Sequence, residues 1–380
     1  MTDINGFCEE KFKNVKEVLL QNFKEDLDVG ASFSVTLNGK FIIDIWGGYA
    51  DANKTRPWEE NTIVNVWSTT KIMTAICTLM LVDQGLLDLD APVAKYWPEF
   101  AQAGKETLPV RYLLSHTAGL SGFDRAPRTK VLYNWEKITN MLAAQKPWWE
   151  PGTKSGYHLV TFGYLLGELI RRITGKTIGT FFKENIASPL NADFHIGLPK
   201  EYDYRVGELI PPPQIDLKSL GDVDPKSIAM RSLTSAVGVN VDATKTREWR
   251  AAEIPAANGH GNARSVARVT AAIACEGTLD GVRLLSLETI EKALEEQSYG
   301  TDLVLNVPIR FGLGLGLQSK ELPISPNQRV LYWGGWGGSV CIMDLDVKLS
   351  IAYVMNKMSS GLTEDIRSDR LIRAVYKSLY

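Results

Sequence analysis

Two side chains that could carry out chemistry together lie three residues apart, in the stretch Asn65-Val66-Trp67-Ser68-Thr69-Thr70-Lys71. The pattern predicts a strand or loop that runs into a helix at Ser68, and residues three apart on a helix share a face. A hydroxyl and an amine would then lie side by side at a helix N-terminus, where backbone N–H groups are unpaired. A nucleophilic serine needs a neighbour that accepts its proton and donors for the developing oxyanion, and this stretch could supply both.

The spacing alone does not separate this chemistry from a structural role. A Ser-x-x-Lys match is expected by chance on the order of once in a chain of this length. The alternative is a serine that caps the helix, followed by a lysine on the surface. The rest of the chain has to distinguish the two.

The helix predicted after Ser68 runs to about Gln84, and Gly85 ends it. Its apolar residues keep helical spacing, and further apolar residues fall on the other faces; the spaced set is Ile72, Ala75, Ile76, Leu79 and Met80. A helix that is apolar nearly all round is buried. Ser68 is therefore expected at the end of a central helix, inside the molecule.

Two later stretches could complete a site around Ser68. Tyr157 follows Pro151-Gly152 and is predicted to open a strongly periodic helix, which Gly175 closes. A glycine-rich stretch, Trp333-Gly334-Gly335-Trp336-Gly337-Gly338-Ser339, lies on a late predicted strand.

The side chains of lysine and tyrosine both titrate near ~10 when unperturbed, too high for a base at neutral pH. Burial would lower the pKa of Lys71, and a nearby cation would lower the pKa of Tyr157. Close together, the two would titrate as a coupled set.

In this order, the three stretches resemble the serine β-lactamase and penicillin-binding-protein superfamily, and above all its esterase branch, the family VIII carboxylesterases. The resemblance covers nearly the whole chain, and an ordered set of motifs is a stronger signal than any one of them. Other stretches that fit it are Leu113-Leu114-Ser115-His116-Thr117-Ala118-Gly119-Leu120, Pro151-Gly152 before Tyr157, and Thr161-Phe162-Gly163-Tyr164-Leu165-Leu166-Gly167-Glu168.

The resemblance implies a role for each residue of the set. Ser68 would be the nucleophile that accepts the acyl group, and Lys71 would hydrogen-bond it and help to remove its proton. Tyr157 would act with Lys71 as the base and then return the proton to the leaving group. The backbone N–H groups of Ser68 and Trp336 would form the oxyanion hole.

The chain departs from the β-lactamase pattern at two motifs. Tyr157-His158-Leu159 replaces Tyr-x-Asn, and Trp333-Gly334-Gly335 replaces Lys-Thr-Gly. The amide that would contact a β-lactam side chain is therefore missing, as is the cation that would attract a substrate carboxylate. Trp333 and Trp336 instead offer apolar walls that suit a short-chain or small neutral ester.

We expect the substrate to lie along Trp333, Gly334 and Gly335, where glycine lets the backbone approach closely. His158, Phe123 and Trp148 are further candidates for the lining of the pocket. For each aromatic residue, packing in the core is an equally good interpretation, because the chain has ten tryptophans.

The four histidines could suggest a different base or a metal site. The chain contains no Gly-x-Ser-x-Gly motif, so a Ser-His-Asp triad is not favoured. His158 and His260 are interpreted as structural or pocket-lining, and His116 and His195 as loop residues that form hydrogen bonds. Their spacing is not that of metal ligands, so we predict no metal and no cofactor. Gly312-Leu313-Gly314-Leu315-Gly316 is interpreted as a glycine-rich strand and not as a phosphate loop.

Strand patterns lie at both ends of the chain, with helices between them. The pattern predicts a helix over 7–23 and then strands over 31–37 and 41–46, joined by the Asn38-Gly39 turn. Late strands are predicted over 329–333, 339–345 and 348–356, before a terminal helix over 363–379. The fold class is α/β (α+β): one antiparallel sheet from both ends of the chain, flanked by helices. The sheet domain would comprise 1–85 and 264–380, with a mostly helical domain, 86–263, inserted.

The composition limits the class of protein. The chain has 380 residues, is 44% hydrophobic and carries a net charge of -2, which suits a large core and argues against nucleic acid as a partner. Its four cysteines are far apart, so no disulfide framework is expected. The N-terminus lacks signal-peptide features, and the longest apolar stretch, 72–82, is too short to span a membrane. We expect a cytoplasmic protein whose partner is a small ester; its oligomeric state stays open.

Three other functions compete with ester hydrolysis. An acyltransferase, like the fungal enzyme that acylates statin precursors, would pass the acyl group to an alcohol or amine. A β-lactamase or a peptidase for D-alanyl peptides is disfavoured by the two missing motifs, although weak β-lactam turnover would fit. A binding protein that kept the fold is disfavoured because Ser68, Lys71 and Tyr157 are all present.

Overall fold

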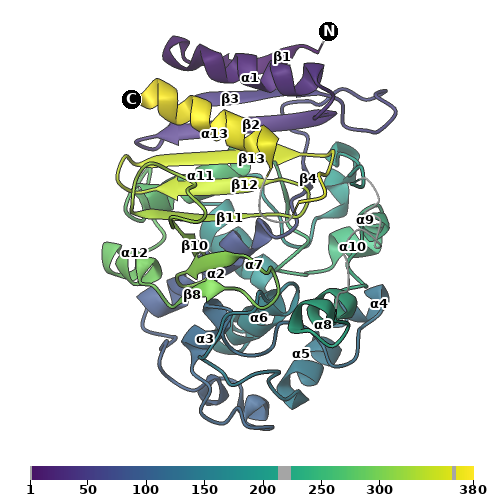
Figure 1. Cartoon of the computed structure of the whole chain (residues 1–380), viewed down its shortest axis with the longest axis vertical. Helices are drawn as coiled ribbons and strands as arrows, with labels where there is room; N and C mark the ends of the chain where they lie inside the picture. Colours follow the sequence, from purple (N-terminus) through teal and green to yellow (C-terminus); the bar gives the residue numbers. More distant parts are fainter. Residues whose placement is uncertain (1, 213–223, 362–364) are drawn as a thin grey trace.

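One antiparallel sheet forms the centre of the computed structural model, which describes residues 2–212, 224–361 and 365–380 (Figure 1). Within these residues the sheet has nine strands, in the order β1-β3-β2-β13-β12-β11-β10-β9-β8. β2 pairs with β13, so strands from the two ends of the chain meet inside the sheet, as predicted. The strands are β1 (Ile4–Cys8), β2 (Gly30–Leu37), β3 (Lys40–Gly48), β8 (Ser298–Thr301), β9 (Pro308–Phe311), β10 (Gly316–Leu317), β11 (Val330–Gly334), β12 (Val340–Asp344) and β13 (Leu349–Met355).

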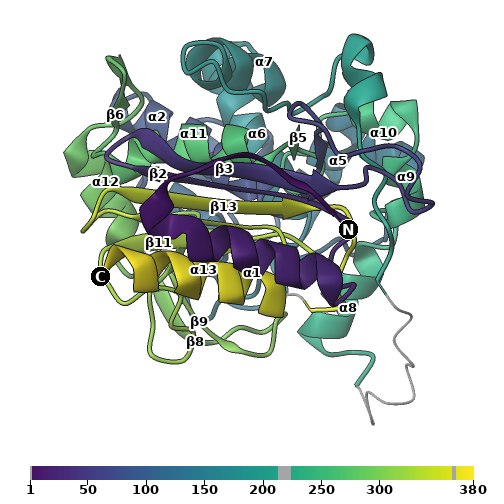
Figure 2. The ribbon, with the colours of Figure 1, turned by 90° about the horizontal axis from the view of Figure 1, so that it is seen from above.

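Helices cover both faces of this sheet (Figure 2). α1 (Lys13–Lys24) and α13 (Ile366–Leu379) lie side by side on one face, and α11 (Ala263–Ala274) packs against β2, β12 and β13 on the other. The small side chains of α11 allow a close approach to the sheet: the hydroxyl oxygens of Thr270 and Ser350 are 2.7 Å apart. Because both faces are covered, β2 and β13 are buried along almost their whole lengths.

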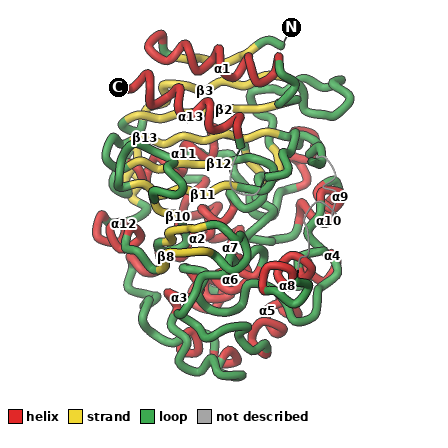
Figure 3. The backbone as a smooth tube through the Cα atoms, viewed as in Figure 1, coloured by secondary structure: helices red, strands yellow, loops and turns green. Residues whose placement is uncertain are grey.

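Most of the other helices gather at the end of the molecule away from α1 (Figure 3). Among them, α2 packs against α6 and α7, and every residue from Thr70 to Leu81 is buried, as its apolar composition predicted. The proposed division into a sheet domain and a helical domain stays a prediction. These helices are α2 (Thr70–Asp83), α3 (Val110–Leu114), α4 (Thr129–Leu132), α5 (Trp135–Ala144), α6 (Thr161–Thr174), α7 (Ile178–Phe182), α8 (Ile228–Ser235), α9 (Val241–Thr244), α10 (Arg247–Ala251) and α12 (Leu287–Leu294).

Two short antiparallel pairs complete the described strands. β4 (Val64–Asn65) pairs with β5 (His260–Gly261), immediately before the Ser68 turn. β6 (Thr278–Leu279) and β7 (Val282–Arg283) form a hairpin whose turn is Asp280-Gly281.

The helix predicted over 7–23 is wrong at its beginning. β1 occupies Ile4–Cys8 and pairs with β3, and α1 begins only at Lys13. Gly6 has φ +88°, and a Cβ there would overlap the carbonyl of Asp44, so this edge strand requires a glycine. The apolar period of α1 in fact starts at Phe12, whereas Phe7 is half exposed.

The glycine-rich segment 312–316, which was predicted to be a strand, is a tight hairpin and not one continuous strand. Gly316 pairs with Phe311, and Gly314 turns the chain with φ +83°. A Cβ on Gly314 would lie 2.6 Å from the Cβ of Ala75, so the glycine allows this hairpin to approach α2. The three consecutive prolines Pro211-Pro212-Pro213 predict an irregular segment, and this segment lies partly outside the described residues, since 213–223 are not described.

Candidate active site

Ser68 lies in the turn between β4 and α2, two residues before the first residue of the helix. The preceding residue, Trp67, has φ +48°, which is rare for a bulky side chain. Its carbonyl accepts hydrogen bonds from the N–H and the hydroxyl of Thr70, at 3.0 and 2.5 Å. Its ring packs against Trp249 and Trp336, with centroids 5.9 and 5.2 Å away. The surrounding contacts therefore hold the residue before Ser68 in an unfavourable conformation, a pattern that clusters at functional sites.

Lys71 is directed at Ser68, as the spacing predicted. Its Nζ lies 3.1 Å from Ser68 Oγ, and it also donates to the carbonyls of Leu159 and Ala256, at 2.7 and 3.0 Å. The side chain is completely buried, and burial holds the pKa of Lys71 well below its usual value. A neutral amine has two N–H groups for the two carbonyls and one lone pair for the proton of Ser68. The geometry therefore suits a general base.

Tyr157 contacts both Ser68 and the late glycine-rich strand. Its hydroxyl oxygen accepts the indole N–H of Trp333 at 2.9 Å, and its ring centroid lies 4.7 Å from Lys71 Nζ. Burial raises the pKa of Tyr157, and hydrogen bonds with Ser68 and Trp333 oppose this only in part. The prediction that a nearby cation lowers the pKa of Tyr157 is therefore wrong, because burial of the phenol is the dominant effect. Tyr157 is a neutral phenol with a proton to donate.

A buried carboxylate holds the backbone of Tyr157. Asp302 is fully buried, and its Oδ1 accepts the N–H groups of Tyr157, Val304 and Leu305 at 3.0, 2.9 and 3.0 Å. The sequence analysis missed Asp302, because the residue belongs to no motif and acts through backbone contacts. Tyr157 itself lies in an irregular segment, four residues before α6, and does not open that helix as predicted.

The glycine-rich stretch closes over the Ser68 turn. The hydroxyl of Ser339 donates to the carbonyl of Val66 at 3.0 Å, which ties this stretch to the residues before Ser68. A Cβ on Gly335 would overlap that carbonyl and lie 3.2 Å from the backbone nitrogen of Ser68, so only glycine fits. In the described part of the chain, neither Ser68 N–H nor Trp336 N–H donates to another group. Both N–H groups are thus available for a substrate oxygen.

The amino-acid sequence matches the family profile described as Beta-lactamase over residues 19–375. The chain belongs to the β-lactamase family.

Similar proteins of this family agree over nearly the whole chain. Esterase/beta-lactamase LipL of Mycobacterium tuberculosis is 35% identical over 370 residues, which are 94% of this chain and 84% of LipL. The crystal structure of a family VIII carboxylesterase is 41% identical with a TM-score of 0.92, and covers 99% of this chain and 100% of that one. A penicillin-binding protein homolog from Caulobacter crescentus is 40% identical with the same TM-score, 0.92, and the same coverage, 99% and 100%. The resemblance and the fold class that the sequence suggested are thereby confirmed.

Three other residues predicted to line the pocket, Trp333, Phe123 and Trp148, lie in different surroundings in this β-lactamase-family chain. Trp333 is 7% exposed and packs on Tyr157 with ring centroids 5.0 Å apart, so it holds the tyrosine. Phe123 is buried in the core. Trp148 is half buried, donates to Asp124 at 2.6 Å, and lines a hollow of about 580 Å³ whose described lining does not include Ser68, Lys71 or Tyr157. The structure therefore places Trp333 against Tyr157, whereas Trp148 lines this other hollow.

His158 is structural and does not face a substrate. It is fully buried; its Nδ1 lies 2.7 Å from the carbonyl of Gly156, and its Nε2 accepts the N–H of Leu120 at 3.2 Å. Burial lowers the pKa of His158 to about 3, so the ring is neutral. His116 is also buried, accepts the N–H of His158 at 3.1 Å and stacks on Phe162. Both nitrogens of His158 are thus used by the backbone, which favours the structural one of its two interpretations.

The remaining predictions concern metals and membranes. Among the described residues, no group of three or more His, Cys, Asp or Glu side chains is arranged to bind a metal ion. In the same residues, no helix combines the length and the apolar character needed to cross a membrane.

Replacing Tyr157 by phenylalanine tests whether its hydroxyl carries a proton to the leaving group. We expect Tyr157→Phe to lower kcat for 4-nitrophenyl butyrate by about 10²-fold, within the usual range for a general acid or base. The loss should be larger for ethyl butyrate, because ethoxide needs a proton more than nitrophenolate does. Stopped-flow and steady-state rates on the two esters measure this.

The control for Tyr157→Phe is Tyr332→Phe, since Tyr332 is also buried beside Trp333, and its hydroxyl forms no hydrogen bond among the described residues. If Tyr157→Phe lowered kcat by the same factor on 4-nitrophenyl butyrate and on ethyl butyrate, this result would contradict the proton-donor role of Tyr157.

Proposed function

We propose that this β-lactamase-family protein is a serine carboxylesterase that forms an acyl-enzyme on Ser68. The observation that carries the proposal is the fully buried Lys71 amine, 3.1 Å from Ser68 Oγ, with both competing contacts on backbone carbonyls. The names of the similar proteins support it, since one is called an esterase/beta-lactamase and another a family VIII carboxylesterase.

Acylation would begin when neutral Lys71 accepts the proton of Ser68. Oγ then attacks the ester carbonyl carbon, and the carbonyl oxygen becomes an oxyanion that the N–H groups of Ser68 and Trp336 stabilise. When the tetrahedral intermediate collapses, the bond to the alcohol oxygen breaks and Tyr157 donates its proton to that oxygen. Lys71 then returns its proton to Tyr157, either directly or through other groups of the site. The side chains of Lys71 and Tyr157 are therefore both neutral in the acyl-enzyme. Water then repeats the sequence and releases the acid.

A small neutral ester is the proposed substrate. The Trp333-Gly334-Gly335 stretch has no cation to attract a substrate carboxylate, and the rings of Trp333 and Trp336 are apolar. Trp333 is almost fully buried against Tyr157, which leaves little room beside the hydroxyl that would meet the leaving group. These features favour short acyl and alcohol groups over the fused ring of a β-lactam.

Intact-mass measurement after mixing with 4-nitrophenyl acetate, butyrate and octanoate tests the proposal. We expect one acyl adduct per chain, located on Ser68, with the fastest turnover for acetate or butyrate. Nitrocefin, measured in parallel, should turn over at least about 10²-fold more slowly, because binding contacts to its carboxylate are missing. Adding short alcohols distinguishes hydrolysis from acyl transfer: a new ester product would favour the acyltransferase alternative. An unlabelled protein, or an adduct on another residue, would contradict the proposal.

A further inference from the structure

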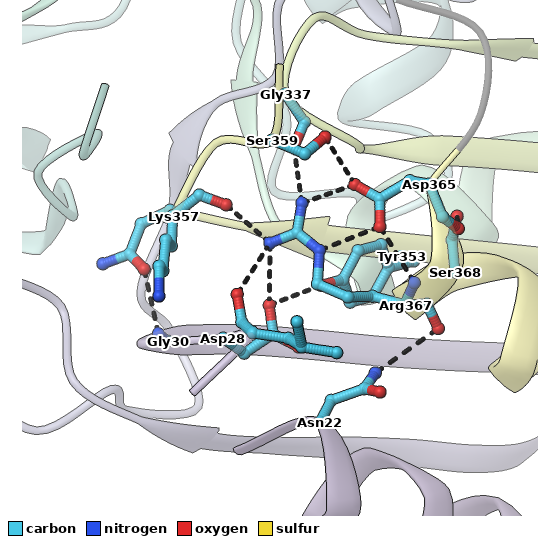
Figure 4. A network of polar contacts seen from close by, with 12 residues as sticks. Asn22, Asp28, Gly30, Gly337, Tyr353, Lys357, Ser359, Asp365, Arg367 and Ser368 are labelled. Atoms are coloured by element: carbon cyan, nitrogen blue, oxygen red, sulfur yellow. Dashed lines mark hydrogen bonds and ion pairs between the residues drawn. The ribbon is translucent and has the colours of Figure 1, made fainter. Parts of the chain in front are cut away.

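Arg367, in the first turn of α13, is a buried cation that ties distant segments together (Figure 4). Its side chain is 3% exposed. Nε and Nη2 bind the two carboxylate oxygens of Asp365 at 2.9 and 2.5 Å, and Nη1 lies 3.1 Å from Asp28 Oδ1. The hydroxyl of Tyr353 also donates to Asp28, at 2.6 Å. Two buried carboxylates therefore fix the guanidinium in place, in a fork geometry that lysine cannot reproduce.

The same guanidinium reaches the turn that carries Trp336. Nη2 donates to the carbonyl of Gly337 at 2.7 Å, and the N–H of Ser359 donates to the same oxygen at 3.0 Å. A Cβ on Gly338 would overlap Asp365 and approach Arg367, so this turn lies directly on the ion cluster. The cluster behind the sheet and the loop above Ser68 are thus in contact.

Two planar peptide groups connect the guanidinium to the oxyanion hole. In a trans peptide the C=O and the N–H point in opposite directions. The group between Gly337 and Gly338 accepts from Arg367 at its oxygen, and its N–H donates to the carbonyl of Gly335 at 3.1 Å. The group between Gly335 and Trp336 accepts that bond, so its own N–H, that of Trp336, points out of the turn on the opposite side. Hydrogen bonds in such a chain polarise one another.

We propose that Arg367 is a positioning residue for ester hydrolysis, which sets the direction of the Trp336 N–H in the oxyanion hole through two hydrogen-bonded peptide groups. This inference rests on the proposed function, since it assigns that N–H to the developing oxyanion. Arg367 does not touch substrate. Its positive charge at one end of the chain draws electron density from both peptide groups and makes the Trp336 N–H a stronger donor.

The competing interpretation is that Arg367 only fastens α13 to the sheet. Both interpretations predict that a substitution lowers stability, because breaking a buried ion cluster leaves charges without partners. Only the positioning role, which acts through the two peptide groups and is called the relay below, predicts a specific loss of oxyanion stabilisation. The rate ratio between an ester and its thionoester separates them, because sulfur accepts hydrogen bonds weakly and gains little from the N–H donors.

The experiment compares wild-type protein, Arg367→Lys and Arg370→Lys on 4-nitrophenyl acetate and its O-aryl thionoester. For Arg367→Lys we expect kcat on the ester to fall about tenfold, less than for complete removal of one donor, with KM within about twofold. The ester-to-thionoester ratio should fall at least about threefold. Arg370 lies on the same helix and pairs with Glu25 near the surface, so Arg370→Lys should keep the wild-type ratio.

An unchanged ratio in folded Arg367→Lys would overturn the inference, as would a loss of activity that merely follows the unfolded fraction in a thermal melt. If Arg367→Lys does not fold, Asp365→Asn takes its place, because asparagine still caps α13 but loosens the guanidinium. The same ratio then decides. The acyl adduct on Ser68 distinguishes the failure of this inference from the failure of the proposed function. If the adduct forms but the ratio is unchanged, only the role of Arg367 is rejected. If the adduct does not form, the esterase function itself is rejected.

Discussion

Ser68→Ala should remove ester hydrolysis almost completely while leaving the fold intact. Alanine has no nucleophile, and the loss of a serine nucleophile typically lowers kcat by about 10⁴-fold or more. The hydroxyl of Ser68 loses only its contacts with Lys71, at 3.1 Å, and with Tyr157, so the melting temperature should change little. The measurement is kcat/KM on 4-nitrophenyl butyrate, together with the intact mass after incubation with the ester.

A matched control for Ser68→Ala is Ser121→Ala. Ser121 is fully buried, and its hydroxyl lies 2.7 Å from that of Ser232, so this variant likewise removes a serine hydroxyl that forms a hydrogen bond. It should retain both activity and the adduct. Activity in Ser68→Ala comparable to that of the wild type would reject the assignment of Ser68 as the nucleophile.

Lys71→Met should have the second largest effect. Methionine keeps the length and burial of the side chain but has no amine to accept the proton of Ser68. We expect kcat/KM to fall about 10³-fold, in the middle of the range for general base catalysis. The wild-type kcat/KM should fall as the pH drops below the lowered pKa of Lys71, since a protonated amine cannot act as the base. This acid limb should be absent from the residual activity of Lys71→Met.

The same burial links Lys71 to stability. Because the pKa of Lys71 is lower in the folded state, the unfolded chain binds the extra proton between that pKa and ~10.4, so stability rises with pH across this window. Relative to Lys71→Met, the free energy of unfolding of the wild type should increase by at most about 1.4 kcal/mol per pH unit there. Urea unfolding at a series of pH values measures this difference.

Lys105→Met separates the loss of a buried lysine from the loss of the base. Lys105 is fully buried, and its Nζ donates to the carbonyls of Gln102, Ala143 and Gln145 at 2.9, 3.0 and 2.5 Å. Burial lowers the pKa of Lys105 to about 8. Both lysines are thus buried and have a lowered pKa, but Lys71 contacts Ser68, whereas Lys105 contacts backbone carbonyls. Lys105→Met should lose stability and keep kcat. Equal losses of kcat in both lysine variants would contradict a base at Lys71.

Local periodicity predicted the parts of the site that depend on neighbours in sequence. The three-residue spacing of Ser68 and Lys71 anticipated their contact, and the apolar composition of α2 anticipated its burial. The edge strand β1 was not predicted, because its residues are mostly exposed and show no alternation of buried and exposed side chains. The place of Tyr157 in the site came from the resemblance, since no local pattern brings it to Ser68.

Contacts through the backbone could not be predicted. Asp302 and Arg367 act on the N–H of Tyr157 and on the carbonyl of Gly337, and any sequence would offer these groups. The orientation of His158 could not be predicted either, because a histidine next to Tyr157 in sequence looks the same whether it faces the pocket or the core. The structure supplies these tertiary directions, and the sequence supplies the residue types.

The pairing of β2 with β13 has a consequence for the order in which the protein assembles. The backbone N–H of Gly30 meets the side chain of Asn356, 326 residues later, so the centre of the sheet closes only through contacts of very high sequence separation. Such topologies fold slowly, and during synthesis β2 waits with an open edge until β13 has left the ribosome. Ser68 and Lys71 are made early but meet Gly335 only at the end. A nascent chain would therefore be inactive, and the open edge of β2 is where premature association would begin.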